Sequence, residues 1–149
     1  MKYDLIEVQS PDDWKDYHFL RRTVLWEAKG RHNYNENHAD ERVKTNHPLL
    51  LKLHDRPIGT ARLDEIGRGS GVVRLVSIAP DVQRSGHGRA LSLLTENYAR
   101  RFGIAMLLVN AAPDAVGFYE KMGWKKEMWD QLELRGLASD CIQMIKNFH

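Results

Sequence analysis

The chain has 149 residues, with 22 basic and 20 acidic side chains and a formal net charge of +2. This length suits one hydrophobic core, so we expect a single domain over residues 1–149. The balanced charge argues against nucleic-acid binding, and the lack of a long apolar run argues against a membrane protein. The lone cysteine, Cys141, excludes an internal disulfide and suits the reducing cytoplasm, where we expect the protein.

The first thirty residues predict a strand followed by a helix. Residues 3–8 alternate between apolar and polar side chains. Ser10 and Pro11, followed by two acids, form a strong helix start, and Gly30 suits a helix end. The residues expected to face the core are Trp14, Tyr17, Leu20, Val24 and Ala28. Trp26 lies on another face, where we expect it to pack on a second helix, and the alternative is a binding surface.

A polar segment over residues 31–48 is rich in histidine and asparagine. Its histidine spacings fit no metal-binding pattern, so we expect no metal site. A solvated loop with a short helix over residues 37–45 is the better interpretation. Long polar loops often carry specificity, so this segment is a candidate border of a substrate site.

The middle of the chain predicts strands over residues 49–53 and 58–63, then a hairpin turn at Gly67–Gly71 and a strand over residues 72–79. Strict alternation puts Arg74, Val76 and Ile78 on one face of the last strand and Val73, Leu75 and Ser77 on the other. A charged Arg74 is unusual in such a run. It indicates either a structural ion pair or a side chain that points into a site.

The second half predicts a helix from His87 to Gly103, a central strand over residues 104–109 and a short helix over residues 114–122. The strand–helix–strand spacing is typical of a right-handed parallel unit. An extended segment begins at Trp124. A final strand over residues 141–146 should turn Ile142, Met144 and Ile145 inward.

The turn between the strand and the long helix has the features of a pyrophosphate cradle. No proline occurs over residues 82–89, so each backbone N–H is available, and Gly86 and Gly88 let a ligand approach closely. The helix N-terminus favours anions, and Arg84 and Arg89 add positive charge. The pattern is neither a P-loop nor a dinucleotide fingerprint. The alternative is an ordinary strand-to-helix turn that uses glycine for its geometry.

Two motifs in the correct order resemble the GCN5-related N-acetyltransferases (GNAT family). Gln83–Gly88 is similar to the family loop Q/R-x-x-G-x-G/A, and Phe118–Trp124 is similar to its aromatic-Tyr-Glu-Lys-x-Gly-aromatic signature. The order of elements across nearly the whole chain also resembles the family domain. The resemblance implies an α/β (α+β) fold with a mixed, mostly antiparallel twisted sheet, a splayed parallel strand pair at its centre and flanking helices.

The resemblance also implies acetyl-CoA as the acetyl donor. The residues expected to hold its pyrophosphate are Arg84, Ser85, Gly86, His87, Gly88, Arg89 and Ala90. Exposed backbone at Val76, Ser77 and Ile78 would pair with the pantetheine arm like an added strand, and Asn110 would line the same gap. Tyr119 matches the family tyrosine that protonates the departing thiolate. The alternative for Tyr119 is a core aromatic.

The implied reaction is direct attack by a neutral amine of a small molecule or a peptide on the thioester, with oxyanion stabilisation by backbone near Ile78. The family often has a glutamate on the strand before the loop, and residues 72–79 contain none. Asp64, Glu65 or a bound water are the candidate bases. Ala112 stands where the family often has asparagine, which puts one contact to the donor in doubt.

The acceptor is not specified by any motif. We expect the polar loop over residues 31–48 and the hairpin at Gly67–Gly71 to border its site. Acids that could attract a cationic amine are Glu27, Glu36, Asp40, Asp64 and Glu65. A homodimer is possible, as is common in the family. The missing glutamate leaves a second hypothesis open, a non-catalytic acyl-CoA-binding regulatory module.

Overall fold

A computed structural model describes residues 2–148. Seven strands form one sheet in the order β1-β2-β3-β4-β5-β7-β6. The strands are β1 (Tyr3–Glu7), β2 (Asn46–Leu53), β3 (Arg56–Gly67), β4 (Ser70–Ile78), β5 (Met106–Ala111), β6 (Lys125–Lys126) and β7 (Ile142–Asn147). Only β4 and β5 pair in parallel, and every other neighbouring pair is antiparallel. The expected mixed sheet is confirmed.

Three α-helices flank the sheet, namely α1 (Pro11–Arg21), α2 (His87–Arg100) and α3 (Val116–Lys121). Ser10 caps α1 as expected, because its hydroxyl accepts a hydrogen bond from the backbone N–H of Asp13 at 3.1 Å. The chain continues past α1 as a π-helical turn at Arg22–Trp26 and a 3₁₀ turn at Glu27–Lys29. We call residues 22–31 the helix extension.

The remaining helical segments are single 3₁₀ turns. They cover Ala39–Arg42, Pro80–Val82, Pro113–Ala115, Gln131–Glu133 and Gly136–Ala138. The first confirms a short helical segment within the polar loop, and the third precedes α3 where the sequence predicts the start of a helix.

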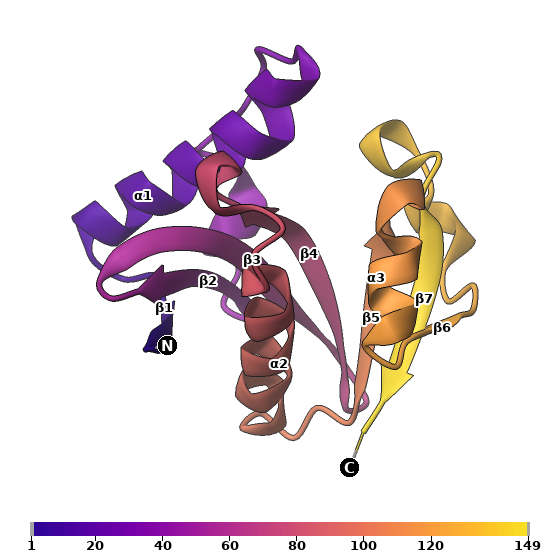
Figure 1. Ribbon diagram of the computed structural model, residues 1–149. Helices are drawn as coiled ribbons and strands as arrows, with labels where there is room; N and C mark the ends of the chain where they lie inside the picture. Colours follow the sequence, from indigo (N-terminus) through magenta and orange to yellow (C-terminus); the bar gives the residue numbers. More distant parts are fainter. Residues whose placement is uncertain (1, 149) are drawn as a thin grey trace.

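The helices cover opposite faces of the sheet (Figure 1). Tyr17 and Leu20 of α1 pack with Leu50, while α2 and α3 cover a larger cluster on the other face. The expected core stripe of α1 is confirmed for these two residues. Val24 is only half-buried and Ala28 is exposed, because the helix extension leaves the sheet at the top of the view.

Strict alternation along β4 is wrong. Val73, Val76 and Ile78 all pack with the same core cluster. Leu75 has a left-handed backbone (φ 53°), and the pairing with β3 shifts register beside it. Such a bulge adds one residue to the strand and exchanges the faces beyond it.

The final strand, β7, differs from its prediction at one residue. Met144 and Ile145 of β7 are buried as expected, whereas Ile142 is 39% exposed because it lies at the start of the strand. The glycine cluster forms the predicted β3–β4 hairpin, in which Arg68 and Gly69 both have positive φ.

The parallel pair is splayed. Pairing of β4 with β5 runs only from Ser70 with Met106 to Val73 with Val109. Beyond that point the strands diverge toward the top of the view (Figure 1). The rest of β4 therefore has no hydrogen-bonded partner on its β5 side.

Candidate active site

A cleft of about 680 Å³ opens where β4 and β5 diverge. One wall comes from β4 and the helix extension, and the other comes from β5, α3 and the segment before β7. Of the predicted site residues, Val76, Asn110 and Tyr119 line this cleft. Residues more than forty positions apart in the sequence thus meet in one site.

The predicted pyrophosphate turn lies between β4 and α2. Arg84 and Gly86 both have left-handed backbones (φ 63° and 85°). Within residues 2–148, none of the backbone N–H groups of residues 84–89 donates a hydrogen bond to another loop or turn. Ala90 differs, because its N–H donates to the carbonyl of Gly86 at 3.3 Å. Consecutive free N–H groups in this geometry form an anion-binding concavity.

The side chains of the turn divide into two groups. Arg84 and Arg89 are exposed and form no ion pair within the described residues. His87 is buried, and its Nδ1 shares a 2.7 Å hydrogen bond with the hydroxyl of Tyr3. Only the backbone of His87 faces the concavity. Gly88 has open space around it, since an added Cβ would meet only the Phe118 ring at 3.8 Å.

The three predicted β4 residues contribute differently. Val76 lines the cleft, whereas the hydroxyl of Ser77 bonds that of Thr60 on β3 at 2.6 Å. The carbonyl of Ile78 accepts a hydrogen bond from Gln83 at 2.9 Å. Any contact of Ser77 with a ligand in the cleft would therefore use its backbone.

Asn110 lies in the cleft wall with both ends of its amide engaged. Its nitrogen donates to Glu133 at 3.1 Å, and its oxygen accepts from Gln143 at 2.9 Å. Glu133 also binds Arg74 through two hydrogen bonds of 2.7 and 3.0 Å. The hydrogen bonds from Arg74 hold the pKa of the Glu133 carboxyl below its usual value. The ion-pair interpretation of Arg74 is confirmed, and its side chain also lines the cleft.

Tyr119 is a core aromatic that also lines the cleft. Its ring packs in the core at 5.3 Å from Phe118 and 5.3 Å from Trp124, while the residue also lines the cleft. Burial raises the pKa of Tyr119 to about 12, so its hydroxyl stays protonated at neutral pH.

The two side-chain bases suggested by the sequence lie outside the cleft lining. Asp64 binds Arg62 at 2.7 Å and Arg74 at 2.8 Å. Glu65 binds His47 at 2.6 Å. Both carboxylates have other partners, so neither is positioned as a general base. Asp140 is the acid that lines the cleft among the described residues, and no sequence pattern pointed to it.

The hairpin at Gly67–Gly71 does not border the cleft, so that expectation is wrong. The carbonyl of Gly69 accepts hydrogen bonds from Ala105 and Met106, where β4 and β5 are still paired. The splay begins at the other end of the paired segment. Of the polar loop, Arg31 is the residue that lines the cleft.

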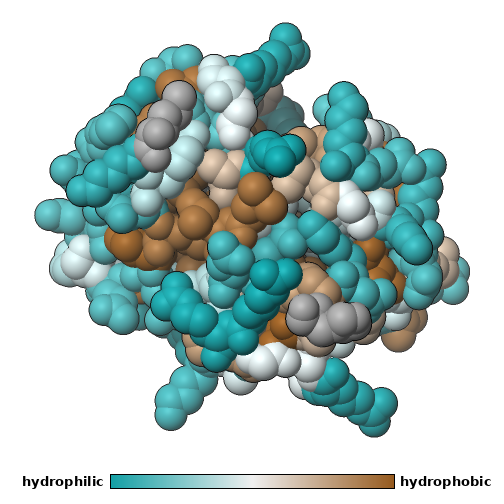
Figure 2. All heavy atoms as spheres, turned by 60° about the horizontal axis from the view of Figure 1, so that its bottom comes forward, coloured by the Kyte–Doolittle hydropathy of each residue, from teal (hydrophilic) through white to brown (hydrophobic). Residues whose placement is uncertain are grey.

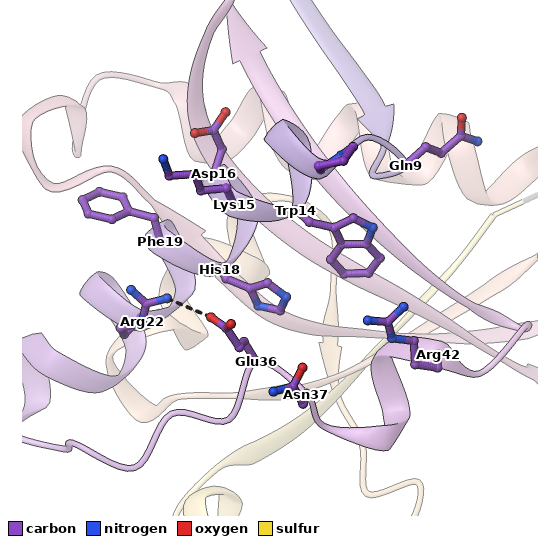
Figure 3. Close-up of a pocket in the computed structure, with 11 residues that line it drawn as sticks. Gln9, Trp14, Lys15, Asp16, His18, Phe19, Arg22, Glu36, Asn37 and Arg42 are labelled. Carbon is purple, nitrogen blue, oxygen red and sulfur yellow. Dashed lines mark hydrogen bonds and ion pairs between the residues drawn. The ribbon is translucent and has the colours of Figure 1, made fainter.

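A second hollow of about 760 Å³ lies between α1 and the polar loop (Figure 3). Trp14 and His18 stack with ring centroids 5.5 Å apart, and Arg22 reaches across to Glu36 at 3.3 Å. It shares no lining residue with the cleft and contains none of the predicted catalytic or donor-binding residues, although Glu36, one of the acids suggested for the acceptor, lines it. The splayed cleft is therefore the stronger candidate.

The face at the bottom of Figure 1 is mostly hydrophilic, and polar side chains interrupt its hydrophobic patches (Figure 2). Scattered exposed apolar groups are ordinary on protein surfaces. This face therefore gives no added support for a homodimer, which stays a prediction. Within residues 2–148, no helix is both long and apolar enough to cross a membrane.

Comparison with known proteins yields one family. The profile described as an acetyltransferase (GNAT) domain matches residues 26–145. A Bacillus subtilis (strain 168) protein named as a candidate acetyltransferase is 24% identical over 120 residues, which cover 80% of this chain and 81% of that protein.

Solved structures show the same fold. The crystal structure of a candidate N-acetyltransferase from Lactobacillus plantarum has a TM-score of 0.83 at 21% identity, with 99% of each chain covered. N-acetylglutamate synthase from Neisseria gonorrhoeae, solved with coenzyme A and N-acetyl-glutamate, has a TM-score of 0.78 at 16% identity. All of this chain and 36% of that one are covered.

Proposed function

Because the chain belongs to the GNAT family of acetyltransferases, we propose that it moves an acetyl group from acetyl-CoA to a primary amine by direct attack. The observation that carries the proposal is the cleft between the splayed strands, with Tyr119 in its wall. The free N–H groups of residues 84–89 lie in the turn before α2 and in its first turn, and they would supply an anion site for the same donor.

Donor binding would use mostly backbone. The N–H groups of residues 84–89, with Arg84 and Arg89 beside them, would hold the pyrophosphate. The unpaired side of β4 near Val76 would accept the pantetheine arm as an added strand. Asn110 would support the opposite wall through its bonds to Glu133 and Gln143 rather than through a free amide.

The reaction needs a neutral amine, since an ammonium has no lone pair. As the amine nitrogen bonds to the carbonyl carbon, the carbon–sulfur bond breaks. The nitrogen loses one proton and the sulfur gains one, so the products are an amide and a free thiol. Backbone N–H groups on the unpaired side of β4 are the donors available to the oxyanion.

Tyr119 suits hydrogen-bond donation to the developing thiolate better than complete proton transfer. Its pKa is about 12, whereas an ordinary thiol has a pKa of about 8.5. Full transfer from the phenol would therefore be unfavourable by about 5 kcal/mol. A buried O–H that stabilises charge only as the bond breaks still lowers the barrier. The proton that ends on sulfur would then come from the amine, directly or through water.

Proton removal from the amine does not require a glutamate on β4. Asp140 lines the cleft and is exposed, and water could bind to backbone on the side of β4 that is not paired with β5. We propose that one of these two takes the first proton. Replacement of Asp140 by Asn separates them, because only the water route would survive it.

The test is thiol release from acetyl-CoA over a panel of amines, with a Tyr119→Phe variant. We expect turnover to fall about 100-fold while coenzyme A affinity, measured by calorimetry, stays within about twofold. Tyr98→Phe is the control, because Tyr98 lies on α2 outside the cleft lining. Unchanged turnover in Tyr119→Phe would refute the role of this hydroxyl.

The alternative function, a non-catalytic acyl-CoA-binding module, is supported by the lack of an acid on β4 and by the ion pairs of Asp64 and Glu65. It predicts coenzyme A binding without thiol release for any amine. Structural relatives include both N-acetylglutamate synthase and a spermidine N-acetyltransferase, so the fold accommodates acceptors of opposite charge. The charged residues that line this cleft therefore bear on the class of acceptor that it binds.

A further inference from the structure

The helix extension brings positive charge to the cleft. Lys29 and Arg31 both line it, Lys29 exposed and Arg31 half-buried. Neither forms an ion pair with another of residues 2–148. The ammonium group of Lys29 and the guanidinium of Arg31 are therefore available to bind an anion in the cleft.

The third cation of the cleft is already neutralised. Arg74 binds Asp64 at 2.8 Å and Glu133 at 2.7 Å. It connects β4 to the 3₁₀ turn at Gln131–Glu133 and contributes a fixed wall rather than free charge. The unpaired positive charge therefore comes from the helix extension alone.

Negative charge is scarce in the cleft. Asp140 is its acid within the described residues. None of the five acids suggested by the sequence lines the cleft, namely Glu27, Glu36, Asp40, Asp64 and Glu65. The expectation that these acids attract a cationic amine is therefore not supported. An extended polyamine would instead meet two unpaired cations and one acid.

We propose that the acceptor is an amine that also carries an anionic group, a carboxylate or a phosphate, which Lys29 and Arg31 bind. Leu25, Trp26 and Leu137 line the same cleft and suit a short apolar skeleton between the two groups. This inference rests on the proposed acetyl transfer and names the class of its acceptor. Charge complementarity of this kind sets specificity more than affinity.

The first experiment compares matched acceptors by thiol release. For each of several apolar amino acids, the panel contains the free acid, its amide and the decarboxylated amine, together with O-phosphoethanolamine and spermidine. The amide has the less basic amine, so chemistry alone would favour it over the acid. We expect kcat/KM at least tenfold higher for an anionic acceptor than for its neutral partner. The better of the carboxylate and phosphate arms identifies the anion.

The second experiment changes the cleft. The Lys29→Gln/Arg31→Gln double variant should lose about tenfold in kcat/KM for the anionic acceptor and little for its amide. Its KM for acetyl-CoA should stay unchanged. Lys15→Gln is the control, because Lys15 is an exposed lysine on α1 outside the cleft. A Lys29→Glu/Arg31→Glu variant should reverse the preference toward spermidine.

The two proposals fail in different ways. If coenzyme A binds in calorimetry but amides or spermidine react as well as the acids, the acceptor inference is overturned and acetyl transfer stands. If coenzyme A binds and no amine reacts or protects the protein in thermal unfolding, the acceptor inference and catalysis both fall. If coenzyme A does not bind, the proposed function itself is wrong.

Discussion

The turn proposed to bind the donor, which we call the donor end, and the part of the cleft proposed to bind the acceptor, the acceptor end, are built in different ways. At the donor end, one local segment, residues 84–89, offers free backbone N–H groups in left-handed and helical conformations. At the acceptor end, side chains of Lys29, Arg31 and Asp140 meet from segments about 110 positions apart. The Arg74–Glu133 ion pair bridges β4 and the segment before β7 beside them.

This difference predicts which substitutions should impair binding at each end. A backbone site depends on local conformation and on empty space, so it is sensitive to an added Cβ and insensitive to charge. A side-chain site depends on a network of charges that the whole fold must hold in place. Substitutions that separate these two dependences test the comparison directly.

Breaking the buried ion-pair chain should have the largest effect. Arg62 is 5% exposed and binds Asp64 at 2.7 Å and Glu41 at 2.8 Å, and Glu41 also binds Arg21 at 2.6 Å. Arg62→Met would remove one ion-pair partner from Asp64 and one from Glu41. We expect a loss of about 3–5 kcal/mol in unfolding free energy and a melting temperature lower by about 10 °C.

The control for Arg62 is an exposed ion pair. Arg56 binds Asp81 at 2.7 Å, with the two side chains 51% and 63% exposed. Arg56→Met should cost less than about 1 kcal/mol. Equal losses in thermal melts of the two variants would contradict a special role for the buried chain.

An added methyl group at the donor end should reduce affinity without reducing stability. Gly88 lies in the first turn of α2, where a Cβ meets only the Phe118 ring at 3.8 Å. Gly88→Ala should therefore leave the melting temperature unchanged or slightly higher, because alanine is favoured in helices by about 1 kcal/mol. If a pyrophosphate approaches this backbone, coenzyme A affinity should fall about tenfold in calorimetry.

Gly117→Ala is the matched control for Gly88. Gly117 lies in α3, and nothing lies within 4 Å of its added Cβ. We expect Gly117→Ala to keep or slightly raise the melting temperature without lowering the affinity for coenzyme A. Wild-type affinity in Gly88→Ala would show that the pyrophosphate is not held at the N-terminus of α2.

The turn proposed as the donor end could be predicted from sequence because its signals are local. Glycines, a missing proline and a helix start over residues 80–90 specify a turn with free N–H groups. The mixed sheet and its splayed parallel pair followed from the family resemblance, which rests on two local motifs. The bulge at Leu75 was missed, because nothing in a run of apolar residues marks a left-handed leucine.

The acceptor end could not be predicted, because its side chains meet only after folding. Asp140 and Glu133 lie in an irregular segment without periodicity, and nothing in the sequence distinguishes Lys29 from any lysine near a helix end. Asp64 looked like an available base, but it pairs with Arg62 two residues earlier and with Arg74 across the strands. Charge pairing of this kind depends on register, which sequence patterns do not give.

The cluster around His47, away from the cleft lining, allows a further test of the comparison. We ask whether the stability that a side-chain cluster contributes depends on pH while ligand binding by backbone N–H groups does not. His47 on β2 lies between Glu7 of β1 at 2.5 Å and Glu65 of β3 at 2.6 Å. The Tyr98 hydroxyl of α2 donates a hydrogen bond to Glu7 at 2.8 Å. The centroid of the Phe102 ring lies 4.4 Å from the centroid of the imidazole. Burial alone would lower the pKa of His47, but the hydrogen bonds to the two carboxylates outweigh it and raise the pKa.

A raised pKa means that folding favours the protonated imidazole. The cluster should therefore stabilise the protein fully below about pH 6.5 and lose that contribution as the pH rises through the folded-state pKa. We expect His47→Gln to lower the melting temperature by about 3 °C at pH 6, with the difference from wild type shrinking toward pH 9. His38→Gln is the control, because His38 is exposed beside Asp40 and should give only a small difference in melting temperature. Coenzyme A affinity should be the same in all three proteins at each pH, since the N–H groups that would bind it do not titrate. A pH-dependent loss of affinity specific to His47→Gln would mean that the two kinds of site are coupled through β1 and α2, and the separation drawn between them would then be wrong.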